Sequence, residues 1–125
     1  MNKIMDNDAR WTWINYKNKS ILFNDYSNFS TEEAIDQMKR FVARIENERL
    51  NDFLFLMDIN KLTFSKDLAA TSHWAASRIK KITKRTAILG VGNMTIVILN
   101  AINHFSGLGM KAFKTREEAL DYLVL

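Results

Sequence analysis

The chain has 125 residues, of which 47% are hydrophobic and 26% are charged, a composition typical of one folded domain rather than of a disordered segment. Cysteine is absent, which excludes disulfide scaffolds, cysteine-ligated metal centres and thiol nucleophiles. The net charge is +4. No apolar run approaches the roughly 20 residues of a transmembrane segment, and the N-terminus lacks a signal-peptide pattern, so we expect a soluble cytoplasmic protein.

The N-terminal region divides into a polar arm and a hairpin. Residues 1–10 show no hydrophobic period, so we predict a flexible arm there and a single domain over 11–125. Two runs rich in aromatic and branched residues, 11–16 and 20–24, predict two strands. The polar linker 17–19 between them suits a tight turn, and the two strands should therefore pair antiparallel.

A helix and a buried strand are expected next. Ser30 and Glu33 have the spacing of a capping box, and apolar residues then recur every three or four positions up to about Arg49. The run 52–58 is almost continuously apolar between polar ends, which indicates a strand covered by helices on both faces.

The rest of the chain continues this alternation. Gly107 and Gly109 end one of the expected helices, and Thr115 with Glu118 forms a second capping box that opens the last one. The expected elements are a helix over 66–83, a strand over 86–91, a helix over 94–105, a strand over 110–113 and a helix from Thr115 to Val124. The order β-β-α-β-α-β-α-β-α predicts an α/β domain with a mostly parallel sheet, antiparallel at its N-terminal side.

Residues that could carry catalysis are sparse. His73 and His104 lie on different expected helices, and neither has a second histidine or a carboxylate four residues later. No serine stands in a Gly-x-Ser-x-Gly elbow. Asp25, Asp52 and Asp58 can end strands, where aspartates more often cap turns than form an acid–base pair. We therefore predict no enzymatic activity, no metal and no cofactor.

Two further features could bind a partner. Gly92 and Asn93 lie between an expected strand and helix, where free amides can hold a phosphate or carboxylate, although a tight turn is the more common reason for glycines at this place. Residues 61–125 carry ten basic against four acidic side chains. A basic patch among them can attract an acidic protein or an anionic lipid, or can be an ordinary solvated helix face. It consists of Arg78, Lys80, Lys81, Lys84 and Arg85.

No aromatic residue is interleaved with this basic patch, so we do not expect a nucleic acid partner.

Several segments resemble the STAS superfamily, and in particular its SpoIIAA-like branch, over residues 11–125. Asp58-Ile59-Asn60 and the later Phe64 resemble the turn that follows a buried strand in that superfamily. The run from Phe113 through Thr115 to Glu117-Glu118-Ala119 is similar to the pattern before its last helix.

The resemblance implies a non-enzymatic regulatory module that binds another protein. In the anti-sigma-factor antagonists of that branch, a serine at the start of a helix is phosphorylated by a partner kinase. Asp67 falls on that position here, and Ser65 lies two residues earlier, so the implied interaction loop is Ser65, Lys66 and Asp67. STAS-like domains are also similar in architecture to the CRAL-TRIO lipid carriers. The alternative is therefore a small-ligand domain for a lipid or nucleotide, with Gly92 and Asn93 facing an anion. The oligomeric state stays open.

Overall fold

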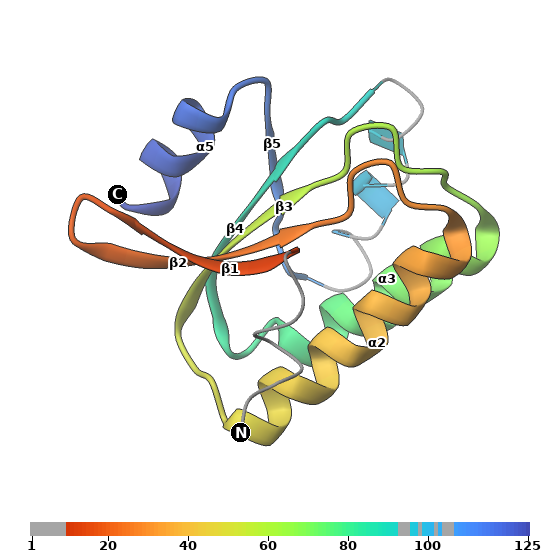
Figure 1. The fold of residues 1–125 in the computed structure, drawn as a ribbon, viewed down its shortest axis with the longest axis horizontal. Coiled ribbons are helices and arrows are strands. Elements are labelled where there is room, and N and C mark those ends of the chain that lie inside the picture. Colours follow the sequence, from red (N-terminus) through yellow and green to blue (C-terminus); the bar gives the residue numbers. More distant parts are fainter. Residues whose placement is uncertain (1–9, 93–95, 98, 102, 104–106) are drawn as a thin grey trace.

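A five-stranded sheet runs through the centre of the protein, with helices on both of its faces (Figure 1). The computed structural model describes residues 10–92, 96–97, 99–101, 103 and 107–125. The elements are β1 (Trp11–Tyr16), β2 (Lys19–Asp25), α2 (Thr31–Glu48), β3 (Phe53–Asp58), α3 (Lys66–Ile79), β4 (Thr83–Leu89), β5 (Lys111–Phe113) and α5 (Arg116–Leu123).

The strands lie in chain order across the sheet, β1-β2-β3-β4-β5. The first two pair antiparallel, and each later neighbour pairs parallel. Lys17 and Asn18 both have left-handed backbones, with φ of 49° and 65°, as a two-residue type I′ hairpin turn requires. The mostly parallel sheet with an antiparallel N-terminal pair confirms the fold expected from the sequence.

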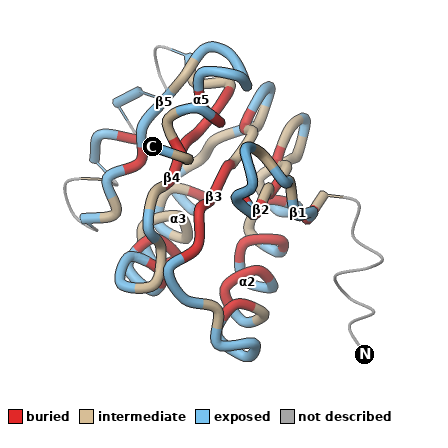
Figure 2. Tube along the Cα trace, turned by 90° about the vertical axis from the view of Figure 1, so that its left-hand side faces the viewer, coloured by how far each residue is buried: buried red, intermediate tan, exposed pale blue. Residues whose placement is uncertain are grey.

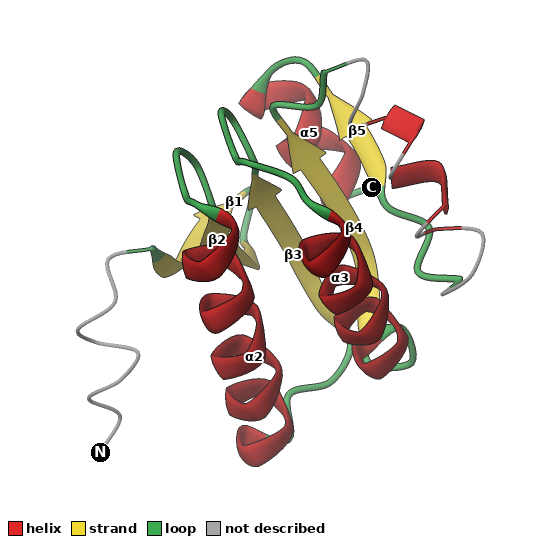
Figure 3. Ribbon diagram, turned by 90° about the vertical axis from the view of Figure 1, so that its right-hand side faces the viewer, coloured by secondary structure: helices red, strands yellow, loops and turns green. Residues whose placement is uncertain are grey.

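Strand β3 is buried on both faces of the sheet, as its unbroken apolar run predicts (Figure 2). Phe53 and Phe55 point into a cluster beneath α2 and α3, while Leu54 and Leu56 point into a second cluster beneath α5. Figure 3 shows α2 and α3 side by side over one face and α5 on the other. In the larger cluster the rings of Phe55 and Phe41 stack with centroids 4.9 Å apart.

Both expected capping boxes are present. The Ser30 hydroxyl accepts from the backbone N–H of Glu33 at 3.2 Å, and the Glu33 carboxylate accepts from the backbone N–H of Ser30 at 2.9 Å. These hydrogen bonds to Ser30 hold the pKa of the Glu33 carboxyl below its usual value. Thr115 and Glu118 make the same reciprocal pair at the start of α5. Local chemistry therefore sets where these two helices begin.

The boundary between α3 and β4 differs from the prediction. The helix expected to reach Thr83 ends at Ile79, and the strand expected to begin at Thr86 begins at Thr83. The Thr83 hydroxyl donates to the Ile79 carbonyl at 2.7 Å, and Thr83 lies opposite Phe53 in the parallel ladder. Pairing with β3 requires an extended backbone from Thr83 onward, and this outweighs the helical spacing of the apolar residues.

The other boundaries that the structure describes agree with the prediction to within two residues. The helix expected over 94–105 lies partly outside the described residues; those described between 96 and 103 are helical. The arm expected over 1–10 also lies outside them, except for Arg10. The Arg10 guanidinium donates to the Ser27 carbonyl at 2.7 Å and lies over the Phe29 ring at 4.1 Å.

The β1–β2 hairpin is tied to α5 on the outer surface. The Tyr16 hydroxyl donates to the Asp121 carboxylate at 2.6 Å, and the Lys17 ammonium donates to the same oxygen at 3.1 Å. These two donors lower the pKa of the Asp121 carboxyl, while the hydrogen bond to Asp121 raises the pKa of the Tyr16 hydroxyl. Lys17 and Asp121 are exposed and Tyr16 is half-buried, so this contact orients the hairpin and adds little stability.

Candidate functional site

An apolar cavity of about 50 Å³ lies between the sheet and the helices α2 and α3, near the carboxyl ends of β3 and β4. A buried water needs about 10–15 Å³ on this measure, so the space holds a few small groups. Phe55, Met57 and Ile88 of the sheet form one wall. The other lining residues come from helices and loops, and they are Tyr26, Met38, Phe41, Ile59, Leu62, Phe64, Ser72, Ala75, Ala76, Ile79, Leu99, Leu108 and Met110.

The cavity exists because α3 presents small side chains to the sheet. Ala75 and Ala76 are both buried and both line the space, where a leucine would extend further toward Ile88. The space is partly open to solvent, so it is a surface-connected pocket rather than a sealed void. Among the described lining residues only Tyr26 and Ser72 carry a hydroxyl, and none carries a charge. The space suits a hydrocarbon group rather than an ion.

A buried polar network holds Tyr26 in the cavity wall. The Gln37 amide donates to Asn24 Oδ1 at 2.5 Å and to the Asp25 carbonyl at 3.2 Å. Asn24 Nδ2 donates to the Tyr26 hydroxyl at 3.0 Å. Asn24, Gln37 and Tyr26 are each at most 1% exposed, so these hydrogen bonds replace the water that the groups lose on folding. The Tyr26 ring also meets the Phe29 ring edge to face.

The loop after β3 closes one end of the cavity. Asp58 Oδ1 accepts from the backbone N–H and the side-chain amide of Asn60, both at 2.9 Å, which shapes a tight turn. Gly90 at the end of β4 presses against this turn with a φ of 86°. A Cβ atom there would lie 2.5 Å from the backbone nitrogen of Asn60, so only glycine fits. Phe64 then brings the same loop back to the cavity wall.

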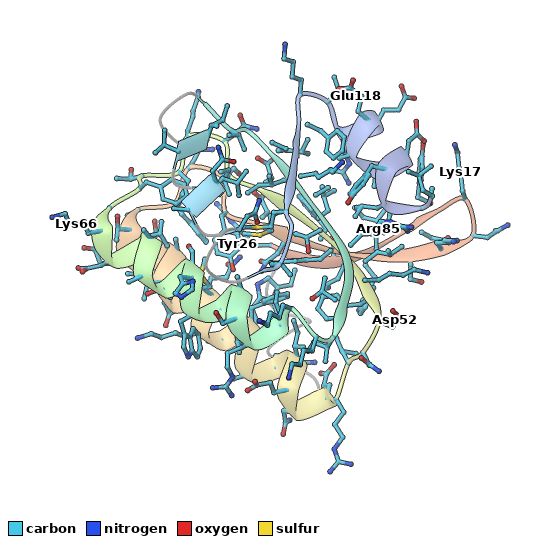
Figure 4. The ribbon with its side chains drawn as sticks, turned by 180° about the vertical axis from the view of Figure 1, so that it is seen from behind. Lys17, Tyr26, Asp52, Lys66, Arg85 and Glu118 are labelled. Carbon is cyan, nitrogen blue, oxygen red and sulfur yellow. The ribbon has the colours of Figure 1, made fainter. Side chains whose placement is uncertain are left out.

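Ser65, Lys66 and Asp67 follow directly after that wall. The Ser65 hydroxyl accepts from the backbone N–H of Leu68 at 3.2 Å and caps α3. Asp67 lies in the first turn of α3, and both Asp67 and Lys66 are exposed. Figure 4 shows Lys66 pointing away from the protein, whereas Tyr26 lies in its interior. The implied interaction loop therefore adjoins the cavity through Phe64, one residue before Ser65.

The five residues of the expected basic patch do not form one cluster. Arg78 makes a two-pronged contact with the Glu46 carboxylate, at 2.8 and 2.7 Å, and lies over the Trp74 ring. Arg78 therefore links α3 to α2, on the face of the sheet that these two helices cover.

Arg85 lies on the other face of the sheet. Its guanidinium donates to the carbonyls of Leu123 and Leu125, at 3.3 and 2.9 Å, beside the end of α5 (Figure 4). Exposed lysines lie between these two arginines along the chain, and they are Lys80, Lys81 and Lys84. Arg85 shares a face of β4 with Ala87 and Leu89, which pack beneath α5, because every second residue of a strand points the same way. Helix α3, which carries Arg78, covers the opposite face of the sheet.

Gly92 lies in the loop after β4. It is exposed, and its carbonyl accepts from the backbone N–H of Ile96 at 3.0 Å. Asn93, its expected partner in holding an anion, lies outside the described residues. The anion site therefore stays a prediction.

The comparisons with known proteins identify the fold. No protein-family model and no curated protein matches the chain. A crystal structure of an uncharacterized protein of the DUF3478 family from Shewanella loihica PV-4, described as having a SpoIIAA-like fold, matches with a TM-score of 0.67 at 20% identity. The match covers 90% of this chain and 91% of that one. The chain therefore has the SpoIIAA-like α/β fold, which confirms the resemblance seen in its sequence; at this identity the likeness establishes the fold alone.

The part of the chain that the structure describes contains no helix long and apolar enough to cross a membrane. It also contains no group of three or more His, Cys, Asp or Glu side chains placed to hold a metal ion.

Sequence reasoning missed the cavity and the polar network beside it. One signal was present: Gln37 falls on the apolar stripe of α2, between Ala34 and Phe41. An amide on a buried stripe needs a partner, so this position predicts a buried hydrogen-bonded network. The partner itself, Asn24, is 13 residues away and belongs to another element, so local periodicity could not identify it.

We predict that Gly90→Ala destabilises the protein by about 2–3 kcal/mol, because the added methyl meets backbone atoms of Asn60 at a left-handed φ. Gly92→Ala is the matched control, since a Cβ there meets nothing within 4 Å, and it should change stability by less than about 0.5 kcal/mol. Urea unfolding measures both. Equal losses for the two variants would refute the role given to Gly90.

We predict that Gln37→Leu and Asn24→Leu each reduce the free energy of unfolding by about 1–3 kcal/mol, because each leaves the other amide buried without its partner. The double replacement should cost less than the sum of the two, since it removes both amides together. A double-mutant cycle in urea measures the difference. Strict additivity would show that the network does not couple the two residues.

Proposed function

We propose that the chain is a non-enzymatic binding module that accepts a small apolar group, such as the end of an acyl chain, in the cavity beneath α3. The observation that carries this proposal is the apolar pocket lined by Ala75 and Ala76, which is partly open to solvent. The two hydroxyl-bearing residues in its lining, Tyr26 and Ser72, could orient one polar group of a ligand.

The absence of an acid or base in the cavity lining supports a binding role rather than a catalytic one. The described lining residues carry no carboxylate, imidazole or ammonium group. General acid–base catalysis most often uses one of these groups. The tyrosine hydroxyl in the lining, that of Tyr26, already accepts a hydrogen bond from the Asn24 amide, which favours a structural role for it.

We predict that a saturated fatty acid or alcohol of suitable chain length raises the melting temperature of the protein, because a ligand that binds only the native state stabilises it. Ligand at 100 times its dissociation constant adds about 2.7 kcal/mol. Ala76→Leu should fill the cavity and weaken binding at least tenfold. Ala70→Leu places the same change on the exposed side of α3 and should leave binding unaltered.

The measurement is a thermal-shift series over chain lengths, followed by calorimetric titration of the best ligand. Ala75→Val is a smaller change in the same wall and serves if Ala76→Leu strains the core. No rise in melting temperature with any chain length, or equal binding by the Ala76→Leu and Ala70→Leu variants, would refute the proposed ligand site.

A protein partner at Ser65, Lys66 and Asp67 is the second candidate. One observation favours it: Leu62 and Phe64 line the cavity, while the residues that follow are on the surface. A group bound in the cavity would contact the same loop that a protein partner would bind, so occupancy of the cavity could change the affinity for that partner.

A photo-crosslinking residue at position 66 tests this surface in the protein's own cells, with position 39 on the exposed face of α2 as control. A protein captured from position 66, absent at position 39 and lost in an Asp67→Lys variant, would support it. The same crosslinks from both positions would count against it.

A further inference from the structure

Within the part of the chain that the structure describes, the outer edge of β1 has no partner strand. In the β1–β2 ladder Trp11 lies opposite Asn24 and Tyr16 lies opposite Lys19, on either side of the two-residue turn. Tyr16 and Lys19 therefore close the hairpin as a hydrogen-bonded pair, and hydrogen-bonded pairs alternate along an antiparallel ladder. The even-numbered residues of β1 thus bond to β2. The N–H and C=O groups of Trp11, Trp13 and Asn15 point away from the sheet.

Strand β1 itself lacks the sequence features that usually protect a free edge. Natural edge strands are blunted by lysine, proline, a bulge or extreme shortness. The six residues of β1 include no charged residue and no proline, and their register with β2 is unbroken. Trp13 is 48% exposed at the middle of the edge. A neutral, regular and aromatic edge of this length is a template for another strand.

We propose that β1 pairs antiparallel with β1 of a second copy of this chain, about a two-fold axis through Trp13, and joins the two sheets into one. In this register the two Trp13 residues face each other, and Trp11 of each copy lies opposite Asn15 of the other. These are the residues whose backbone groups point outward, so each of the three pairs can exchange two hydrogen bonds. The half-exposed indoles of the two Trp13 residues then cover one another.

Charge favours a second copy in this orientation. Arg10 flanks one end of β1, and in the antiparallel register the Arg10 residues of the two copies lie at opposite ends of the paired strands. A parallel arrangement of two copies would instead place Arg10 beside Arg10. The opposite sheet edge, β5, has only three residues, so pairing of β1 with β5 would match poorly. A two-fold β1–β1 contact is closed, and the assembly stops at a dimer.

One strand on each side makes a small interface, so the dimer should be weak and should appear only as concentration rises. Sedimentation velocity of the full chain over a concentration series is the first measurement. The dimer fraction of the native chain should grow steadily with concentration.

Asn15→Pro is the decisive variant, because proline removes the outward N–H of residue 15 and leaves the β1–β2 hydrogen bonds in place. Asn15→Ala keeps that N–H and is the matched control. We expect dimerisation at least tenfold weaker for Asn15→Pro and unchanged for Asn15→Ala. Trp13→Lys places a charge at the two-fold axis and should weaken the dimer similarly, which keeps the test valid if proline disturbs the hairpin.

Amide hydrogen exchange locates the contact. The amides of the exposed residues Trp13 and Asn15 should exchange quickly at low concentration and become protected as the dimer forms, whereas those of Thr12 and Ile14 should be protected throughout. A chain that stays monomeric up to its solubility limit would overturn the proposal. So would a dimer that neither Asn15→Pro nor Trp13→Lys weakens.

Discussion

The burial of β3 on both faces is the constraint from which the rest of the architecture follows. Phe53 and Phe55 on one side and Leu54 and Leu56 on the other leave no face of this strand that water can touch. A strand of this kind must have a neighbour on each edge and a helix layer on each face. Helices α2 and α3 supply one layer, and α5 supplies the other. The parallel connections then follow, since each crossover helix returns the chain to the same end of the sheet.

Close packing over this strand is interrupted where α3 turns alanines toward β4. The same helix ends in contact with the strand it precedes, and the loop that starts it adjoins the cavity through Phe64. The cavity, the loop after β3 and the exposed start of α3 are therefore parts of one structural unit. The tight approach of Gly90 to Asn60 fixes the end of that unit, because backbone meets backbone there.

Local patterns predicted much of the fold, for reasons that are visible in single elements. The capping boxes at Ser30 and Thr115 and the apolar stripe of α2 are interactions within one turn or one face, so spacing alone reveals them. The end of α3 at Ile79 was predicted wrongly, because the extended backbone from Thr83 depends on pairing with β3. The apolar residues there do have helical spacing, but the hydrogen bonds of the β3–β4 ladder outweigh it.

The sequence by itself determined the class of fold, the order of strands and helices and the start of the capped helices, because each depends on neighbours in the chain. Tertiary structure alone decided that Ala75 and Ala76 border a cavity, that Gln37 meets Asn24, and that Arg85 lies apart from Arg78. Such features depend on how much space distant elements leave between them and on which face of a strand each side chain takes. The spacing of apolar residues within one segment does not reveal the space between distant elements or the face of the sheet on which a neighbouring element packs.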